Sequence, residues 1–452
     1  MIRRPTAQSV LDRFHHPAQI IVTAFAVAAG IGTALLASPL AGESGEPTRL
    51  IDALFTAVSA VCVTGLVVVD TGGHWSAFGE VTIMLLIQAG GLGIMTLATL
   101  FAVMISGRLG LRARMWAQAE TKTLQPADLR RVIRNVVLFS LATEAVIATV
   151  LTIRFATGYG EQLGRAAYLG LFHAVSAFNN AGFGLWPDNL VRFATDAWIC
   201  LPIAAGVVIG GLGFPVVFEL FRSWRHPRSW SVLTRITVVV TAALLLAGFL
   251  VFTITEWGNP RTLGPMDVPG KLLAGFFTGV MPRTAGFNSL DVAAMEPTSW
   301  LATDMLMFIG GGSAGTAGGI KVTTFAVLAY VLWAELRGET RVNAGHRRLT
   351  AAVQRQALTI ALLSVALVIV STYVLLAITP HSLDKLLFET ISAFATVGLS
   401  TGITAALTPA GQLLVALLMF AGRVGPATLF SALALRTRVR RYELPEEQVI
   451  VG

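Results

Sequence analysis

Eight long apolar segments, separated by short polar stretches, dominate the hydropathy pattern of the chain. Each holds about 20 residues or more, the length that a helix needs to cross roughly 30 Å of hydrocarbon. The pattern therefore predicts an all-α polytopic membrane protein. The predicted spans are residues 17–39, 78–106, 131–155, 197–221, 235–256, 299–334 (interrupted), 356–379 and 409–435.

Within each successive pair of spans lies a shorter apolar stretch that ends at a three-residue phrase with a final glycine. These stretches hold about 10–14 residues, too few to cross a bilayer, so they indicate re-entrant half-helices. We therefore expect four pseudo-symmetric span–pore-helix–filter–span repeats around one central pore. The four phrases are Val63-Thr64-Gly65, Asn180-Ala181-Gly182, Thr284-Ala285-Gly286 and Thr396-Val397-Gly398.

Basic residues predict the orientation of these repeats. Most of the 33 lysines and arginines lie at the two ends of the chain and in the linkers between repeats. Because loops rich in Lys and Arg stay in the cytoplasm, both termini and all linkers are expected there. The predicted repeats are 17–106, 131–221, 235–335 and 356–435, the linkers are 107–130, 222–234 and 336–355, and the ends are 1–16 and 436–452.

The composition excludes several classes of protein. Apolar residues make up 54% of the 452 residues and charged residues 13%, whereas soluble domains carry about 25% charged residues. The lipid bilayer is therefore the expected surroundings. The net charge of +8 is scattered over short loops between spans, so no nucleic-acid partner is expected.

Nothing in the sequence indicates an enzyme. The seven histidines are dispersed, and no zinc-protease, nucleophile-elbow or phosphate-loop motif is present. His173, inside a predicted half-helix, is expected to be a packed residue. The two cysteines, Cys62 and Cys200, lie in different apolar segments and give no disulfide framework, so we expect small buried side chains and no covalent cofactor.

The four phrases suit a cation filter. A dehydrated cation needs oxygen ligands on all sides, and backbone carbonyls supply them where the strand adopts unusual φ and ψ, which glycine permits. The half-helices point their C-terminal ends at this place, and the partial negative charge of a helix C-terminus favours a cation. We predict that the carbonyls of all twelve phrase residues bind the ion.

Polar residues next to the phrases are expected to support the strands. Arg283 immediately precedes the third phrase, and its guanidinium is expected to donate to carbonyls behind the filter. Asn179 and Asn180 are expected to bond neighbouring strands. Glu144 lies well inside the third span and needs a partner that the sequence does not identify.

A glycine-rich break follows each phrase in the second span of its repeat. The breaks begin at Gly90, Gly210, Gly310 and Gly422. The third, within 310–321, cannot remain a regular helix, because each glycine costs about 1 kcal/mol relative to alanine. Irregular backbone at membrane depth must be buried in protein or line a cavity. Our hypothesis is a gating loop under the filter, and the alternative is a simple hinge. The gating residues would be Gly310, Gly311, Gly312, Ser313, Gly315, Thr316, Gly318, Gly319 and Lys321.

Two basic residues accompany this loop. Arg423 replaces the second glycine of the fourth break, and a charge at membrane depth usually faces a cavity. We expect Arg423 to project into the pore below the filter, repel cations and pin the loop, with a salt bridge elsewhere as the alternative. Lys321 either acts with the loop or extends to the cytoplasmic interface.

These motifs closely resemble the Trk/Ktr/HKT superfamily of potassium transporters, and among them the KtrB-type membrane subunit. The resemblance covers about residues 17–440 and includes the four phrases, the 310–321 loop and the Arg423 segment. Trk-type relatives usually have additional N-terminal spans, so the start of this chain at the first repeat favours the Ktr branch. Some sodium-preferring members carry serine at the position of Gly65, so Gly65 matches the potassium type.

The resemblance implies a potassium uptake function at the bacterial inner (plasma) membrane. It also implies a homodimer on a cytoplasmic ring of KtrA-type nucleotide-binding subunits, which would bind ATP, ADP or dinucleotides. Sodium stimulates some members, so Na⁺ is a candidate activator. The alternative is a sodium-selective or K⁺/Na⁺ co-transporting member of the superfamily. A secondary transporter with two inverted halves is disfavoured, because the four repeats have the same sense.

Overall fold

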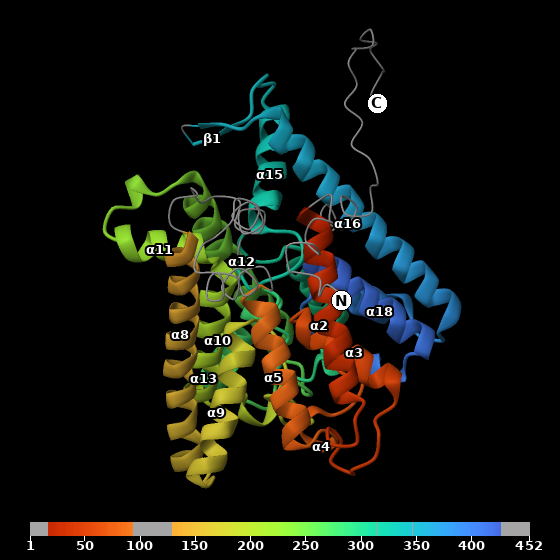
Figure 1. The fold of residues 1–452 in the computed structure, drawn as a ribbon. Coiled ribbons are helices and arrows are strands. Elements are labelled where there is room, and N and C mark those ends of the chain that lie inside the picture. The colour runs from red at the N-terminus through yellow and green to blue at the C-terminus, as the bar shows by residue number, and fades with distance from the viewer. Residues whose placement is uncertain (1–16, 94–128, 314, 346, 426–452) are drawn as a thin grey trace, which may run out of the picture.

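The computed structural model describes residues 17–93, 129–313, 315–345 and 347–425 (Figure 1). In this part of the chain nearly all regular structure is helical, and the sheet is a two-stranded hairpin of β1 (Asn343–Ala344) and β2 (Arg347–Arg348). The predicted all-α class is therefore confirmed. The predicted ends 1–16 and 436–452, and the linker 107–130 up to residue 128, lie outside the described residues.

Four long helices agree with the predicted first span of each repeat. Each is followed along the chain by a shorter helix that packs against it. The long helices are α2 (Pro17–Leu36), α8 (Leu129–Gly158), α12 (Val232–Glu256) and α16 (Ala351–Ile378). The shorter ones, called the inner helices below, are α3 (Leu50–Val61), α9 (Leu163–Phe178), α13 (Val268–Val280) and α17 (Leu383–Phe394).

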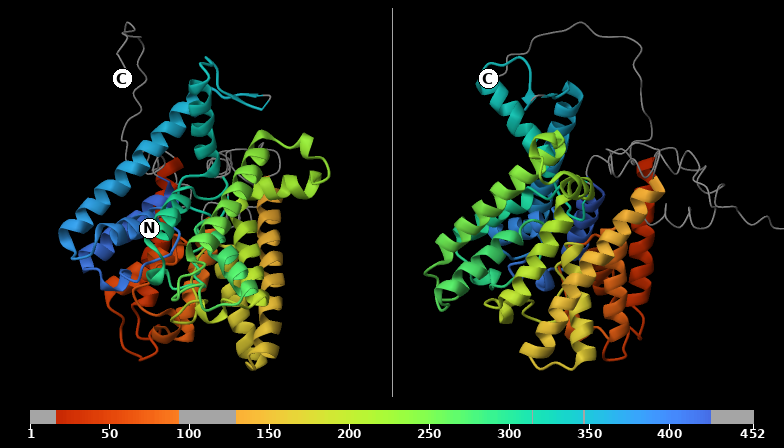
Figure 2. Two further views of the ribbon diagram at one scale, coloured as in Figure 1. Left: turned by 180° about the vertical axis from the view of Figure 1, so that it is seen from behind. Right: turned by 90° about the vertical axis from the view of Figure 1, so that its left-hand side faces the viewer.

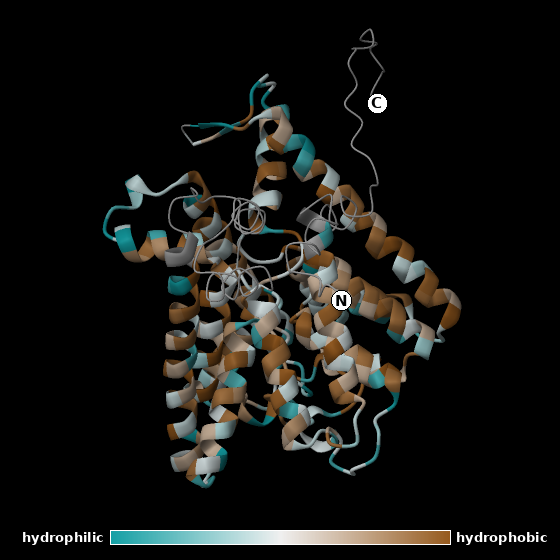
Figure 3. Cartoon of the chain, viewed as in Figure 1, coloured by the Kyte–Doolittle hydropathy of each residue, from teal (hydrophilic) through white to brown (hydrophobic). Residues whose placement is uncertain are grey.

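Burial separates these two sets. By length and composition, α12, α16 and the Ile133–Gly158 part of α8 could each cross a membrane, yet only 22–28% of their most apolar stretches is buried. By contrast, α3 is buried throughout from Phe55 to Val61. The long helices therefore present apolar surface outward, as lipid contact requires, and the inner helices fill the centre. Figure 3 shows the resulting apolar bundle, with hydrophilic segments gathered at its two ends.

The second helix of each repeat is shorter than predicted. The interruption predicted within 299–334 is observed between Phe308 and Val322, whereas the segment predicted as one span over 197–221 bends by 101° after Leu212. The predicted 78–106 and 409–435 are described only as far as Gly93 and Gly425. These second helices are α5 (Ala77–Gly91), α10 (Ala197–Leu212), α14 (Pro297–Phe308) and α18 (Pro409–Val424).

The glycine breaks explain these lengths. Gly93, Gly213 and Gly425 end three of the second helices with φ of 77°, 93° and 89°, values that residues with a side chain rarely adopt. Beyond Gly213 the chain continues as α11 (Phe214–Ser223), and beyond residues 309–321, called the glycine loop below, it continues as α15 (Val322–Leu336).

The remaining elements are short. The β1–β2 hairpin pairs Asn343 with Arg348 in antiparallel register and projects from one end of the bundle in all views (Figure 2). It lies within the predicted linker 336–355, where the sequence did not predict a strand. The other short helices are α4 (Thr71–His74), η2 (Val191–Phe193), η3 (Pro227–Ser229), η4 (Val292–Ala294) and η5 (Thr404–Ala406). The element order agrees with the predicted repeats, whose boundaries stay a prediction.

Candidate functional site

The inner helices all end next to the glycine phrases. α3 ends at Val61, α9 at Phe178, α13 at Val280 and α17 at Phe394, one to three residues before the phrase that follows. The unpaired carbonyls of a helix C-terminus carry a partial negative charge of about half an electron. Four such ends therefore lie beside the four phrases.

The phrases share one unusual backbone conformation. In each, the first residue and the glycine both have positive φ, although the first residue is not glycine. Such a conformation costs on the order of 1–3 kcal/mol at a residue with a side chain, and it concentrates at functional sites. Among the described residues, Asn189 is the one other non-glycine residue with positive φ. The first residues have φ of 56° at Val63, 60° at Asn180, 67° at Thr284 and 50° at Thr396.

The four phrases contact one another in a closed ring, called the glycine ring below. The glycine of each phrase lies against the carbonyl oxygen of the middle residue of the next phrase, and the fourth returns to the first. A Cβ atom at any of the four glycines would come within 3.0 Å of that oxygen, closer than real Cβ atoms approach, so a side chain at any of these positions requires the backbone to shift. The pairs are Gly65 with Ala181, Gly182 with Ala285, Gly286 with Val397, and Gly398 with Thr64.

A cavity of about 390 Å³, called the outer cavity below, opens on one side of the glycine ring. All four ring glycines line it, together with the acidic residues Asp70 and Asp291 and the hydroxyls of Ser400 and Thr404. The ring therefore forms the floor of a solvent-open cavity with carboxylates in its wall. Within the described residues, no group of three His, Cys, Asp or Glu side chains could hold a metal ion.

Side-chain support of the ring differs from strand to strand. The Gly65 and Gly398 N–H groups donate to the hydroxyls of Ser59 and Ser392, each at 3.1 Å. Ser176 occupies the same place before the second phrase, and its buried hydroxyl has no hydrogen-bond partner among the described residues. Val280 occupies this place before the third phrase. The first and fourth strands are therefore held alike, and the second and third differ from them.

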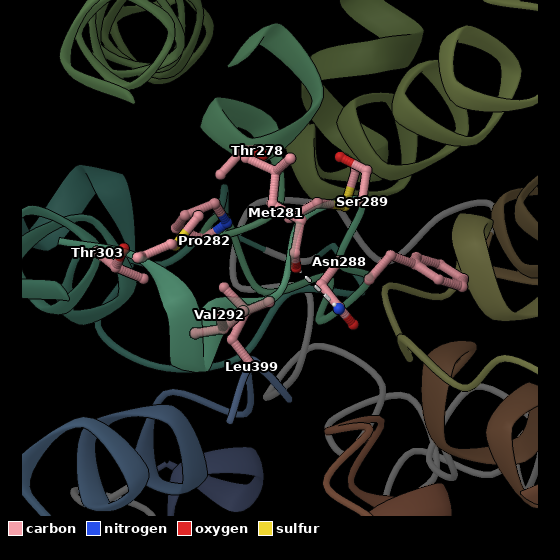
Figure 4. Close-up of a pocket in the computed structure, with 11 residues that line it drawn as sticks. Thr278, Met281, Pro282, Asn288, Ser289, Val292, Thr303 and Leu399 are labelled. Carbon is pink, nitrogen blue, oxygen red and sulfur yellow. Dashed lines mark hydrogen bonds between the residues drawn. The ribbon is translucent and has the colours of Figure 1, made fainter. Parts of the chain in front are cut away.

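A small cavity lies behind the third strand (Figure 4). Its volume of about 10 Å³ is close to the least that holds one water molecule. The buried hydroxyls of Thr278 and Ser289, which line it, have no hydrogen-bond partner among the described residues. Leu399 of the fourth strand lines the same cavity. The third strand therefore packs against a small cavity. The first and fourth strands instead have a hydrogen bond to a serine.

The glycine loop lies against the ring on the side away from the outer cavity. The Thr316 hydroxyl donates to Asn180 Oδ1 at 2.7 Å, and Gly318 packs so closely on Thr396 that a Cβ there would clash with the threonine hydroxyl. Asn180 and Thr396 are the first residues of the second and fourth phrases. The loop predicted over 310–321 is therefore placed directly under two of the four strands.

Arg283 joins the third strand to the start of the glycine loop. Its guanidinium donates to the carbonyls of Ile309 and Gly310, each at 2.9 Å, and only 5% of the residue is exposed. The sequence led us to expect acceptors behind the strands, and the observed acceptors are the first two carbonyls of the loop. These hydrogen bonds offset the free-energy cost of removing the charged guanidinium from water, and without them that cost would be uncompensated.

Two further basic residues bind the same loop. Arg423 donates to the Thr316 carbonyl and also to the Gly90 carbonyl at the first break. Lys321 donates to the carbonyls of Ala317 and Gly318. Lys321, the last residue of the loop, therefore bonds two carbonyls within it. Arg423 touches both the loop and a second break, so it links two elements that are far apart in the chain.

A buried polar network that the sequence did not reveal surrounds Glu144. Its carboxylate accepts from Gln88 Nε2 at 3.0 Å, Ser140 Oγ at 3.1 Å and Asn179 Nδ2 at 3.2 Å. Asn179 Nδ2 also lies 2.9 Å from Gln88 Oε1. Asn179 therefore bonds α5 and α8 and not a neighbouring strand, whereas Asn180 does reach the next strand at the Arg283 carbonyl, 3.4 Å away. The overlooked signal was Gln88, a polar residue in the middle of an apolar helix.

Three of the four breaks make the same contact with an inner helix. Gly90 packs on the Val61 carbonyl, Gly210 on the Phe178 carbonyl and Gly422 on the Phe394 carbonyl. In each pair the carbonyl belongs to the last residue of an inner helix, and a Cβ on the glycine would clash with it. These glycines therefore allow the second helix to approach the end of the inner helix.

The remaining residues singled out in the sequence are packed. Cys62 and Cys200 are buried free cysteines, as expected. His173 is fully buried, stacks on Trp186 with ring centroids 4.6 Å apart, and lies 3.3 Å from the Leu185 N–H. It therefore anchors the segment after the second phrase.

Comparison with known proteins gives a consistent result. A family model described as TrkH, a cation transport protein, matches residues 3–437. The chain is 39% identical over 436 residues to Ktr system potassium uptake protein B of Bacillus subtilis (strain 168), covering 96% of this chain and 97% of that protein. It is 36% identical over 443 residues to potassium/sodium uptake protein NtpJ of Enterococcus hirae, covering 96% and 97%.

A solved structure has a similar fold. The crystal structure of the potassium transporter TrkH from Vibrio parahaemolyticus matches with a TM-score of 0.72 at 18% sequence identity, covering 92% of this chain and 84% of that one. At this identity the likeness concerns the fold alone, and it agrees with the helical membrane architecture described above.

Proposed function

Because the chain belongs to the TrkH family of cation transport proteins, which are transporters and not enzymes, we propose that it takes up potassium across the plasma membrane through a central pore. The names of its relatives, a potassium uptake protein and a potassium/sodium uptake protein, support the choice of ion. The observation that carries the proposal is the closed glycine ring at the floor of the outer cavity. Four strands in mutual contact can surround one ion.

The glycine ring acts as the selectivity filter. Carbonyl oxygens of the twelve phrase residues replace the water shell of K⁺, and the C-terminal ends of the inner helices stabilise its charge. Gly182 differs from the other ring glycines, since its carbonyl accepts a bond from Asn189 Nδ2 at 3.0 Å. A membrane potential of 100 mV, negative inside, contributes about 2.3 kcal/mol to the influx of each K⁺.

The glycine loop and Arg423 form the gate. The contacts of Thr316 and Gly318 with the second and fourth strands support a loop that obstructs the pore under the filter. Arg423, bonded to the Thr316 carbonyl, holds the loop there and repels cations. Lys321 contributes to this hold. Arg283 and Asn179 support the filter from the third strand and from α9.

The setting of the protein follows from its relatives and its charge. We infer a multi-pass protein of the bacterial inner membrane with both termini in the cytoplasm, since the linkers are basic. The name of the relative, a Ktr system protein B, supports a membrane subunit that works with another subunit. We infer a homodimer on a cytoplasmic nucleotide-binding ring, with Na⁺ as an activator.

Growth complementation tests the function. The gene is expressed in a bacterium that lacks its own potassium uptake systems, with and without a cytoplasmic partner subunit, and growth is followed at low potassium. Restored growth together with saturable ⁸⁶Rb⁺ uptake is expected. The matched control is Gly30→Ala, a helix glycine with nothing within 4 Å of an added Cβ. A chain that reaches the membrane but gives no Rb⁺ uptake with either partner setting would contradict the proposal.

A sodium-permeable transporter is the second candidate, because the relative NtpJ is named a potassium/sodium uptake protein. Competition of Na⁺ with ⁸⁶Rb⁺ uptake separates the two. Potassium selectivity predicts weak competition by Na⁺ in the wild type and stronger competition in Gly65→Ser. Equal competition in both proteins would favour the second candidate.

A further inference from the structure

Helix α11 turns sharply away from the helix that precedes it in the chain. It begins after Gly213 and runs at 101° to α10, the helix before it in the chain. If α10 runs across the membrane, α11 lies close to the membrane plane. Figure 1 shows α11 at the end of the bundle where the β1–β2 hairpin also projects, and Figure 3 shows hydrophilic residues there.

Contacts with α8 set the depth of α11. Phe218 and Phe221 both meet Phe139 edge-on, with ring centroids 5.9 Å apart in each pair. Phe139 precedes Gly158, the far end of α8, by a helical rise of about 28 Å. The hydrocarbon layer is about 30 Å thick, so if Gly158 lies at its opposite boundary, α11 lies near the other boundary and not at the centre.

The end of α11 and the turn after it combine exposed aromatic rings with exposed arginines. Phe221 is 70% exposed and Trp224 is 65% exposed. Arg222, Arg225 and Arg228 are exposed beside them, and the Arg225 guanidinium lies 4.8 Å from the centre of the Trp224 ring. Aromatic rings and basic side chains on a short amphipathic helix are typical of segments that lie at the interface between lipid tails and headgroups.

The acidic residue of α11 does not cancel these charges at the surface. Glu219 accepts from the Ser231 N–H at 2.6 Å, the Ser231 hydroxyl at 2.7 Å and the Thr234 hydroxyl at 2.5 Å. Partial burial acts to raise the pKa of Glu219, but these hydrogen bonds outweigh it and hold the pKa below its usual range. Glu219 is therefore engaged with the start of α12, and the arginines face outward.

We propose that α11 and the turn after it bind the headgroups of anionic phospholipids. Arg222, Arg225 and Arg228 would contact the phosphates, and Phe221 and Trp224 would enter the boundary of the acyl chains. Charge complementarity favours this occupant, because each basic residue near an anionic membrane strengthens binding substantially. A zwitterionic lipid offers the same apolar boundary without the net negative charge.

The hinge of α11 touches the glycine loop directly. The Gly312 N–H donates to the Gly211 carbonyl at 2.7 Å, and the Thr316 N–H donates to the Gly210 carbonyl at 3.2 Å. Gly213 itself packs on the Ser313 carbonyl, where a Cβ would clash. A lipid that fixes the angle of α11 therefore also fixes a hinge that holds the loop. This step rests on the proposed gate, whereas the lipid binding does not.

A quenching titration tests the binding. Detergent-solubilised protein is titrated with a short-chain brominated phosphatidylglycerol, and separately with the matching phosphatidylcholine. The signal of Trp224 is the difference in fluorescence between wild type and Trp224→Phe. Phosphatidylglycerol is expected to quench Trp224 at much lower concentration than phosphatidylcholine. The variant carrying Arg222→Gln, Arg225→Gln and Arg228→Gln is expected to need roughly 100-fold more phosphatidylglycerol.

The control variant removes the same charge from the neighbouring linker. Three of the exposed arginines of the linker 336–355 are replaced in Arg337→Gln, Arg341→Gln and Arg347→Gln. This variant is expected to titrate like the wild type. Equal quenching by the two lipids, or equal loss in the two triple variants, would overturn the proposal. Binding of a purified cytoplasmic subunit to this segment, without quenching by phosphatidylglycerol, would assign the surface to a protein and would also overturn it.

The flux measurement tests the link to the loop. Wild type and both triple variants are reconstituted in vesicles of phosphatidylcholine alone, and of phosphatidylcholine with one quarter phosphatidylglycerol. Phosphatidylglycerol is expected to change wild-type ⁸⁶Rb⁺ flux about threefold or more and to leave the α11 variant unchanged. Flux that ignores lipid composition while quenching persists would remove the link and keep the binding. Absence of all flux would contradict the proposed function alone.

Discussion

At the first, second and fourth breaks the second helix closes on the end of an inner helix, whereas at the third break the chain opens into the glycine loop. Gly90, Gly210 and Gly422 each pack on the last carbonyl of an inner helix. Gly310 instead packs on Gly318 within the loop, and its carbonyl is held by Arg283. Similar glycine motifs thus give three close contacts with inner helices and one loop.

The residues that follow each break explain why the third one forms the glycine loop and the other three do not. The first, second and fourth breaks have leucine or valine as their third residue, Leu92, Leu212 and Val424, and a left-handed glycine follows. The third continues with Gly312 and Ser313, which offer no apolar side chain to pack. Its backbone polar groups are satisfied by other means, including the Gly211 carbonyl and basic side chains. Buried irregular backbone persists only with such partners.

The largest expected effect comes from adding a methyl group where a break glycine packs on the last carbonyl of an inner helix. Gly422→Ala or Gly210→Ala places a methyl group against a backbone carbonyl that cannot move aside. Overpacking of this kind costs about 1–3 kcal/mol or more, so we expect loss of most folded protein and of Rb⁺ uptake. Thermal unfolding in detergent and uptake in cells measure both.

Gly30→Ala provides the control for this comparison. Gly30 lies inside α2 with nothing within 4 Å of an added Cβ. Alanine there gains up to about 1 kcal/mol of helix propensity, so the unfolding temperature should stay equal or rise. A similar loss of folded protein and of Rb⁺ uptake in Gly30→Ala and Gly422→Ala would show that the clash with the backbone carbonyl is not the cause of that loss.

Freeing the loop should have the next largest effect. Arg423→Ala removes the donors to the Thr316 and Gly90 carbonyls together with the positive charge. We expect ⁸⁶Rb⁺ flux in vesicles to rise about tenfold, which corresponds to a loss of about 1.4 kcal/mol from the barrier. Arg423→Lys keeps the positive charge but loses the guanidinium that bonds both carbonyls. Its flux should therefore lie between the fluxes of the wild type and Arg423→Ala. Unchanged or reduced flux in a well-folded Arg423→Ala protein would contradict a pore gate.

Loosening the start of the loop should have a smaller effect. Arg283→Lys keeps a buried charge but cannot bond the Ile309 and Gly310 carbonyls as a fork. We expect a loss of about 1–3 kcal/mol in stability and weaker discrimination between Rb⁺ and Na⁺, because the third strand begins next to Arg283. Thermal unfolding and ion competition check this. Lys271→Arg, at the half-buried Lys271 in the first turn of α13, far along the chain from the third phrase, is the control and should change neither.

Much of this architecture follows from the pattern of residues along the chain. Apolar length predicts the long helices, and the four phrases predict where strained backbone is needed. The bend of 101° at Gly213 does not follow, because a glycine break indicates where a helix ends and not the direction in which the chain continues. The acceptors of Arg283 do not follow either, since they depend on how the loop folds back. Contacts that join three helices, such as those of Glu144, leave no periodic signal.

Substitution of Glu144 gives the smallest expected effect and sharpens the comparison among the three breaks that contact inner helices. At the first break, Asn179 packs on Gly91 and bonds the Glu144 carboxylate, so a buried polar network holds this break. Glu144→Gln replaces one acceptor oxygen by a donor facing other donors. We expect a loss of about 1–2 kcal/mol in stability and a few-fold loss of Rb⁺ preference over Na⁺, since Asn179 adjoins the second strand. Glu161→Gln, which breaks a surface pair with Arg165, should change stability by less than about 0.5 kcal/mol. Equal unfolding temperatures of the two variants would mean that the hydrogen bonds of Glu144 do not stabilise the first break.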